Sequence, residues 1–244
     1  MNLWKQLIKE VTNVESFKLL PAGDRAAVAD FGNVIDEAVN RQVNRLKDLL
    51  LIEKIAGIEE MVPAFSSLLI LYNPQLLKFT ELGEKLKKIN LTPESMNSTQ
   101  KRILEIPCCY GGEYGEDLTD LAKLSGLSEA EIIAIHSSRD YRVYMLGFLP
   151  GFVYLGGLDE RIAAPRLKTP RVAIPAGSVG IGGDQTGVYP IASPGGWRLI
   201  GKTPVKFYDP ARKQPILCQA GDYIRFVPIT ANEYNQLAKE GGAL

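Results

Sequence analysis

Two residues stand out for their chemistry, a histidine and an arginine that follows it closely. His136 is the only histidine in the 244 residues, and imidazole is the side chain best suited to proton transfer near neutral pH. Arg142 stays charged and can hold a carboxylate or phosphate with two hydrogen bonds. His136 is therefore a candidate catalytic residue, with its charged form favoured by the end of a helix. The alternative is a histidine that packs its helix onto the fold.

The stretch 141–204 is rich in glycine, proline and basic residues. Closely spaced glycines let backbone amides approach a ligand, and Arg or Lys side chains could bind its anionic groups. The alternative is that glycine and proline turn the corners of a compact barrel and that the cations are solvated. The candidate substrate- or nucleotide-binding residues are Arg142, Arg171, Gly182, Gly183, Gln185 and Lys202.

Residues 196–203, GWRLIGKT, match the phosphate-loop pattern G-x4-G-K-[ST]. That loop must follow a buried strand and open a helix, so that helix amides face the phosphates. Here Pro194 precedes the match and the strand-like run 204–208 follows it. We therefore predict strand, turn and strand over 196–206, with Lys202 outside any phosphate loop.

Composition restricts the class of protein. Lys plus Arg equals Asp plus Glu, 28 each, so nothing attracts the chain to nucleic acid or to an anionic membrane. The three cysteines are an odd number and two are adjacent, which fits no disulfide framework and favours a reducing compartment. One histidine argues against a structural zinc site, and we predict no metal site. Without a signal peptide or an apolar span, the chain is expected to be cytoplasmic.

The first part of the chain predicts strand pairs separated by helices. Apolar residues at helical spacing, Val39, Val43, Leu46 and Leu50, give the helix over 36–52 one buried stripe. The other predicted elements are strands at 17–20, 26–31, 58–62 and 67–72 and a helix at 75–88. This order suggests a small α+β sandwich of ferredoxin-like type over residues 1–90.

A polar segment, residues 91–101, is typical of a linker and leads to a second domain over 102–244. That domain opens with a strand at 103–108 and two helices, the second starting at a capping box of Ser128 and Glu131. From Tyr141 onward, short strands at 141–146, 172–174, 205–208 and 223–227 alternate with Gly and Pro before a final helix at 232–239. Many short strands with such turns indicate a closed β-barrel.

Long motifs in both parts resemble the allophanate hydrolase subunit 1 family. They include GDRAAVADFG at 23–32, HSSRDYRVYMLGFLPGFVYLGGL at 136–158, PAGSVGIGGDQTGVYP at 175–190 and SPGGWRLIGKTP at 193–204. The resemblance covers roughly residues 17–228 and implies a ferredoxin-like domain followed by a cyclophilin-like β-barrel. The first 14 or so residues precede the usual family start and could form an amphipathic extension.

The resemblance also implies a function. Family members include the B subunit of ATP-dependent 5-oxoprolinase, which works with 5-oxoprolinase subunits A and C, with ATP as cosubstrate together with Mg and no organic cofactor. This interpretation makes the chain a component of a lactam hydrolase, inactive alone. Two alternatives within the family are inhibition of a sporulation sensor histidine kinase and a carboxyltransferase-like part in the urea and allophanate pathway. One fold serves all three, so the fold cannot choose among them.

Overall fold

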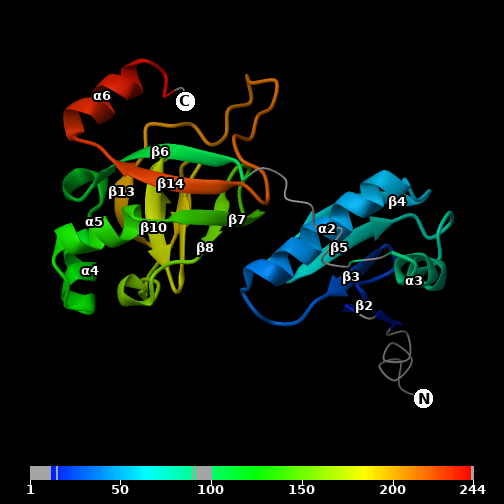
Figure 1. Ribbon diagram of the computed structural model, residues 1–244. Coiled ribbons are helices and arrows are strands. Elements are labelled where there is room, and N and C mark those ends of the chain that lie inside the picture. Colours follow the sequence, from blue (N-terminus) through cyan, green and yellow to red (C-terminus); the bar gives the residue numbers. More distant parts are fainter. Residues whose placement is uncertain (1–11, 15, 90, 92–100, 243–244) are drawn as a thin grey trace. The chain divides into compact units, whose positions relative to one another are not determined.

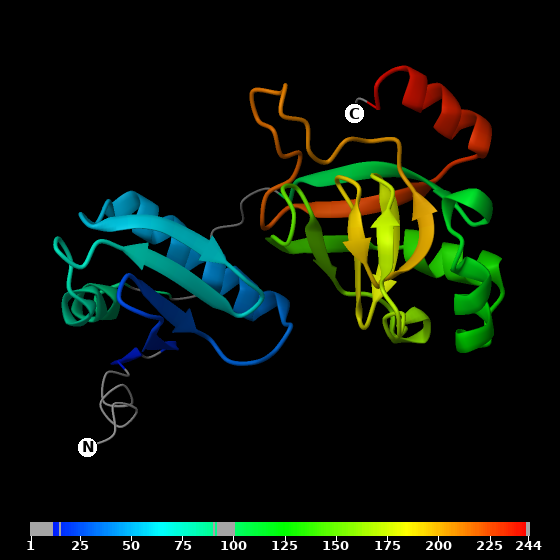
Figure 2. The same cartoon turned by 180° about the vertical axis from the view of Figure 1, so that it is seen from behind.

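The computed structural model describes residues 12–14, 16–89, 91 and 101–242. The chain divides into two compact units, residues 1–99 and 100–244, and each is treated by itself below (Figures 1 and 2). Most of the predicted linker and of the N-terminal extension lies outside the described residues. The exception at the N-terminus is a short strand, β1 (Thr12–Val14).

Within its described residues, the first unit is an antiparallel sheet with two helices. Its strands follow the order β1-β2-β3-β5-β4. The elements after β1 are β2 (Phe17–Pro21), β3 (Ala26–Asp30), α2 (Glu37–Glu53), β4 (Ile58–Pro63), β5 (Ser67–Tyr72) and α3 (Phe79–Lys87). This arrangement confirms the predicted α+β character, and the predicted strands are all present.

Helix α2 forms where the sequence predicts it. Asp36 caps its start by accepting a hydrogen bond from the Val39 backbone N–H, at 3.0 Å. Most of the predicted stripe is buried against the sheet, with Val43 and Leu46 fully covered and Leu50 2% exposed, whereas Val39 is half-buried. Helix α3 is shorter than predicted, because residues 74–76 form a turn in which the Asn73 side chain accepts from the Gln75 backbone N–H, at 3.0 Å. An Asn side chain that bonds its own backbone competes with helix formation.

The second unit is a closed barrel with the strand order β10-β11-β8-β7-β14-β6-β13, in which β13 returns to β10. A separate ribbon pairs β9 with β12. The barrel strands are β6 (Ile103–Tyr110), β7 (Asp140–Leu146), β8 (Val153–Gly156), β10 (Ser178–Gly182), β11 (Gln185–Val188), β13 (Arg198–Lys202) and β14 (Tyr223–Pro228), and the ribbon strands are β9 (Arg171–Ile174) and β12 (Ser193–Gly195).

Helices of the second unit are α4 (Leu118–Ser125), α5 (Glu129–Ser137) and α6 (Ala231–Lys239), with short 3-10 turns η3 (Gly112–Tyr114) and η4 (Glu160–Ile162). Figure 1 shows α4 and α5 beside each other at one end of the barrel and α6 over β6. Gly126, in the left-handed conformation, ends α4, and the predicted capping box of Ser128 and Glu131 starts α5.

One predicted strand is wrong. Residues 205–208 form no strand, and only Tyr208 makes an isolated bridge, to Ile216. Val205 and Phe207 are buried as the alternating pattern suggested. However, the Val205 backbone N–H donates to the Thr203 hydroxyl, at 3.1 Å, so this donor is not available for a strand ladder. The alternation of apolar residues at 205–208 therefore reflects burial of Val205 and Phe207, and it does not require that the segment pairs with a strand.

Candidate functional site

His136 lies at the end of α5 and is fully buried. Its Nδ1 is 2.8 Å from the Tyr110 hydroxyl oxygen, and its Nε2 is 2.9 Å from the Thr186 hydroxyl oxygen. The Thr186 hydroxyl donates onward to the Gly180 carbonyl, at 3.0 Å. We call these four residues, Tyr110, His136, Thr186 and Gly180, the histidine chain; it joins β6, α5, β11 and β10.

The imidazole of His136 is held in a neutral, aromatic environment. Its ring centroid lies 4.7 Å from that of Phe226 and 5.3 Å from that of Tyr141. Burial lowers the pKa of His136 to about 3, and the charge of Arg139 adds to the effect. The prediction that the helix end favours a charged ring is wrong, because desolvation outweighs the helix dipole. With both ring nitrogens bonded to protein, the geometry favours the packing alternative.

Arg142 lies in β7, where its backbone pairs with Tyr223 of β14 and Gly156 of β8. The side chain is 8% exposed, and Nη1 donates to the Tyr223 hydroxyl, at 3.3 Å. The guanidinium carbon also lies 5.7 Å from the centroid of that ring. This arginine is therefore packed into the wall between β7 and β14.

Arg171 opens β9 and binds two carboxylates. Its Nη2 donates to Asp117 Oδ1, at 2.8 Å, and its Nε is 2.9 Å from Glu116 Oε1. The other oxygen of Asp117 accepts the Leu199 backbone N–H of β13, at 2.6 Å. We call Asp117, Arg171 and Leu199 the aspartate clamp. Within the described residues, Arg171 Nη1 is buried and has no hydrogen-bond partner.

Gly182, Gly183 and Gln185 belong to the hairpin that joins β10 and β11, and Gly182 pairs with Gln185. Gly183 has a φ of +71°, a left-handed conformation that suits glycine. Its N–H donates to the Ala164 carbonyl, at 2.8 Å, and its own carbonyl accepts from the Ala164 N–H, at 3.1 Å. The Gly183 amide therefore already has a protein partner, whereas the side chain of Gln185 is partly exposed.

Trp197 explains several glycines and was missed by reasoning from sequence. A Cβ on Gly182 would lie 2.4 Å from the indole Nε1, and one on Gly187 would lie 3.0 Å from the ring. The indole packs with Phe152 and Tyr189 in a cluster on the outer face of the barrel. The Arg166 guanidinium carbon lies 5.8 Å from the ring centroid. The only sequence feature that pointed to it is a tryptophan directly after two glycines, and this pattern does not predict which residues the indole contacts.

Lys202 ends β13, and its side chain is partly exposed. The prediction that Thr203 does not open a helix is confirmed, because residues 203–206 are irregular. The second strand of the predicted strand, turn and strand is absent. Arg198–Lys202 fills the middle of the motif as a barrel strand, so the geometry needed for a phosphate loop is not formed here.

The described residues contain no group of three or more His, Cys, Asp or Glu side chains that could hold a metal ion. The three cysteines are free and buried, and burial raises the pKa of Cys218 to about 12. Within the same residues, no helix is both long and apolar enough to cross a membrane.

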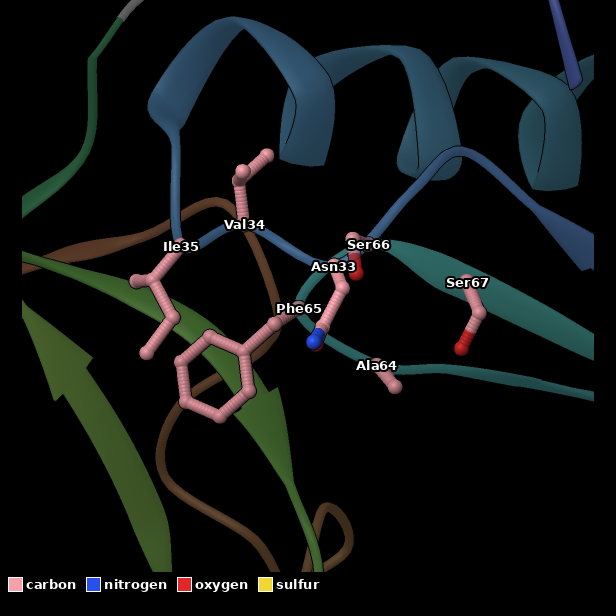
Figure 3. Close-up of a pocket in the computed structure, with 7 residues that line it drawn as sticks. All are labelled: Asn33, Val34, Ile35, Ala64, Phe65, Ser66 and Ser67. Atoms are coloured by element: carbon pink, nitrogen blue, oxygen red, sulfur yellow. The ribbon is translucent and has the colours of Figure 1, made fainter.

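A hollow of about 320 Å³ lies on the first unit, between the loop before α2 and the turn between β4 and β5. Figure 3 shows Ile35 and Phe65 pointing the same way from these two segments, with Val34 turned away from them. The Asn40 side chain fixes the turn by donating to the Ala64 and Phe65 carbonyls, at 3.1 and 3.2 Å. None of the residues selected from the sequence lies here.

The structure thus separates the selected residues by exposure. Arg171, Gln185 and Lys202 have partly exposed side chains in the barrel unit, whereas His136 and Arg142 are buried. The histidine chain connects His136 to the strands of the hairpin that carries Gln185. Reasoning from sequence missed Tyr110, Asp117 and Thr186, whose roles depend on contacts with distant segments. These features define a two-unit α+β protein with a closed barrel and a glycine-rich outer wall.

Comparison with known proteins gives the family. The family described as carboxyltransferase domain, subdomain C and D, matches residues 17–218, and the chain belongs to it. The B subunit of 5-oxoprolinase from Bacillus subtilis (strain 168) is 43% identical over 238 residues, which cover 92% of this chain and 98% of that protein. The protein of the same name from Escherichia coli O157:H7 is 43% identical over 84% of this chain and 93% of its own length. The resemblance seen in the motifs is confirmed.

A solved structure shows the same fold within a longer chain. The crystal structure of TTHA0988 matches with a TM-score of 0.76 and 37% sequence identity. The match covers 85% of this chain but 40% of that chain. This chain therefore spans less than half of that protein.

Proposed function

We propose that this chain is the B subunit of an ATP-dependent 5-oxoprolinase, active together with A and C subunits. The proposal depends on one observation, the 43% identity to the B subunit of the B. subtilis 5-oxoprolinase over nearly the full length of both chains. The match covers 92% of this chain and 98% of that protein. The barrel, the hairpin and Trp197 lie in or beside the motifs that first suggested the family.

The chemistry explains why such an enzyme needs several contacts. The lactam of 5-oxoproline is stabilised by resonance, and its carboxylate repels hydroxide. Transfer of a phosphoryl group from ATP to the amide oxygen, with release of ADP, would make the ring carbon electrophilic. Water could then add to that carbon, phosphate would leave, and the ring C–N bond would break to give glutamate. Such a site needs cations for phosphates and carboxylate and dipoles for the developing charge.

Among the residues selected from the sequence, Arg171, Gln185 and Lys202 are the best candidates for ligand contacts, since their side chains are partly exposed. Arg171 is already paired with Asp117 and Glu116. Within the described residues, Nη1 is the Arg171 nitrogen without a partner, and it is buried, so Arg171 offers less to a ligand than Gln185 or Lys202 does. Lys202 would supply a positive charge near the same wall of the barrel. We assign no proton transfer to His136, because its ring is buried and fully bonded.

ATP and Mg would have to be bound largely by partner subunits. Mg²⁺ at a nucleotide usually has phosphate oxygens, waters and one or two carboxylates as ligands. The described residues of this chain provide neither a metal-binding group nor a phosphate-loop geometry. No step of the reaction is therefore assigned to Mg on this chain. We further propose the ferredoxin-like and cyclophilin-like classes for the two units, and a cytosolic location.

Reconstitution tests the proposal. The purified chain is expected to release no glutamate from 5-oxoproline and ATP, and the mixture with its cognate A and C subunits is expected to release it. The matched control is the A and C mixture without this chain, which should be inactive. Turnover by the chain alone would contradict the proposed need for A and C subunits. A fully assembled but inactive mixture would contradict the proposed function.

A further inference from the structure

The histidine chain has a direction that follows from counting protons. Thr186 has one hydroxyl proton, and it is donated to the Gly180 carbonyl, which can only accept, at 3.0 Å. The Thr186 oxygen must then accept a hydrogen bond from the His136 Nε2–H, 2.9 Å away. Since a neutral imidazole carries one N–H, Nδ1 has a lone pair and accepts from the Tyr110 hydroxyl, at 2.8 Å. Every hydrogen bond in the histidine chain is thus donated in the direction from β6 toward β10.

We propose that His136 is a positioning residue, held as the Nε2–H tautomer by its hydrogen bonds to Thr186 and Tyr110, that fixes Thr186 and through it the outward pose of Gln185 at the β10–β11 hairpin. This inference rests on the proposed function, in which Gln185 is a ligand contact. It goes further by assigning Tyr110 and Thr186 roles and by replacing a catalytic His136 with a positioning one.

The alternation of side chains along β11 carries the effect from the inside of the barrel to its surface. Thr186 is fully buried and pairs with Ile181, a residue of the main core. Its neighbours on the strand point the other way, and a Cβ on Gly187 would meet Trp197 on the outer wall. Gln185 shares that outer side. A fixed Thr186 therefore limits the rotation of the strand that presents Gln185.

The hairpin is held at both ends. At its tip, Gly183 and Ala164 exchange two backbone hydrogen bonds. At its base, the hydroxyl of Thr186 bridges His136 and Gly180. His136 is itself held in place, because its carbonyl accepts from the Tyr141 hydroxyl, at 2.9 Å, and its ring packs between Tyr141 and Phe226. The ring cannot adjust easily if its tautomer changes.

Thr186→Val tests what holds the tautomer, because it removes the acceptor for Nε2–H and leaves the Tyr110 hydroxyl in place. The Tyr110 hydroxyl can accept as well as donate, so the Nδ1–H form is then no longer disfavoured. Tyr110→Phe should keep the Nε2–H form, because a buried Nδ1–H would have no acceptor there and the Gly180 carbonyl would lose the Thr186 hydroxyl. Tyr141→Phe is the matched control, since it also removes one hydroxyl bonded to His136, but at the carbonyl rather than the ring.

Nitrogen NMR of the single histidine reads the tautomer directly, because the chain contains no other imidazole. In the full-length protein and in Tyr141→Phe, we expect a protonated Nε2 and an unprotonated Nδ1, unchanged over roughly pH 5 to 8. In Thr186→Val we expect a mixture of both tautomers, and in Tyr110→Phe the wild-type tautomer. An Nδ1–H signal in the wild type, or an unchanged spectrum in Thr186→Val, would overturn this assignment.

Kinetics of the reconstituted complex test the positioning. Tyr110→Phe and Thr186→Val should raise KM for 5-oxoproline or ATP by about 10-fold, with a smaller change in kcat, as expected when binding is weakened. Thr186→Ser, which keeps the hydroxyl, should restore KM. Combining Tyr110→Phe with Gln185→Ala should be no worse than Gln185→Ala alone, because coupled residues are not additive. Additive losses, or an unchanged KM in a folded Tyr110→Phe complex, would overturn the positioning role.

The failure of this inference differs from failure of the proposed function. An assembled wild-type complex that does not convert 5-oxoproline would refute the function, while the NMR result would stand. An active wild-type complex with normal kinetics in Tyr110→Phe and Thr186→Val would refute the positioning role alone.

Discussion

Helices α4 and α5 are neighbours, yet they are joined to the barrel in opposite ways. At the start of α4, Asp117 reaches β13 and Arg171 through an ion pair and a short hydrogen bond. At the end of α5, His136 reaches β11 and β6 through neutral hydrogen bonds only. Both residues are buried, at 5% and 0% exposed.

The difference follows from where each link lies. The histidine chain reaches the core, where desolvation makes a charge costly and a closed set of neutral donors and acceptors is stable. The aspartate clamp lies under a ribbon whose arginine is 24% exposed, so its charges remain partly hydrated. The comparison predicts that breaking the aspartate clamp leaves the Arg171 charge with only the exposed Glu116 as its partner. Breaking the histidine chain leaves only unpaired neutral groups.

The largest effect is expected for Asp117→Ala. It leaves the Leu199 N–H without its acceptor and the Arg171 guanidinium with only the exposed Glu116 carboxylate, and removing one partner of a buried ion pair costs about 3–5 kcal/mol. Urea unfolding measures the loss. Glu116→Ala is the control, since this carboxylate also contacts Arg171 but is 57% exposed, and it should cost about 0–1 kcal/mol. Equal losses of unfolding free energy for the two variants would show that Asp117 stabilises the fold no more than Glu116 does.

Acid should act on the histidine chain. The pKa of His136 is lowered from 6.5 to about 3 in the folded protein, so between these values only the unfolded chain takes up the proton. The free energy of unfolding should therefore fall as pH decreases below about 6.5, by up to about 1.4 kcal/mol per pH unit from this residue. His136→Gln should remove this part of the slope. Parallel pH profiles for the two proteins would contradict a neutral buried ring.

A smaller loss is expected for Thr186→Val, which deletes the hydroxyl and keeps the shape. His136 Nε2–H and the Gly180 carbonyl would both lose a partner, at a cost of about 1–3 kcal/mol. Thr119→Val is the matched control. Its hydroxyl bonds Glu129 at an exposed position, and the substitution should change stability by about 0.5 kcal/mol or less. A Thr186 variant as stable as the control would show that the histidine chain does not stabilise the fold.

The smallest effect concerns the start of α5. Ser128→Ala removes a cap that accepts the Glu131 N–H, at 3.3 Å, and should cost about 1 kcal/mol. Because α5 carries His136 at its other end, this variant shows whether loosening the helix alone affects the histidine chain. Nitrogen NMR should keep the wild-type tautomer. A changed tautomer would mean that the helix, and not the hydrogen bonds of the histidine chain, decides which ring nitrogen is protonated.

Local features were predictable from sequence, and long-range ones were not. The capping box at Ser128 and the glycine stop at Gly126 depend on a few adjacent residues and were confirmed. The contact between His136 and Thr186 spans 50 positions, and that between Asp117 and Leu199 spans 82. No spacing rule connects such residues. The strand predicted at 205–208 failed for a related reason, since burial alternates there while no neighbouring strand is available to pair.

By itself, the sequence determined the α+β composition of the chain, most of its strands and helices, and its family, because periodicity, capping residues and long motifs are local. It also singled out His136 and the glycine-rich region. Only the tertiary structure decided what His136 does, because burial lowers its pKa to about 3 and distant Tyr110 and Thr186 bond both nitrogens. Protonation depends on the surroundings that folding creates, and a residue's identity alone does not contain them.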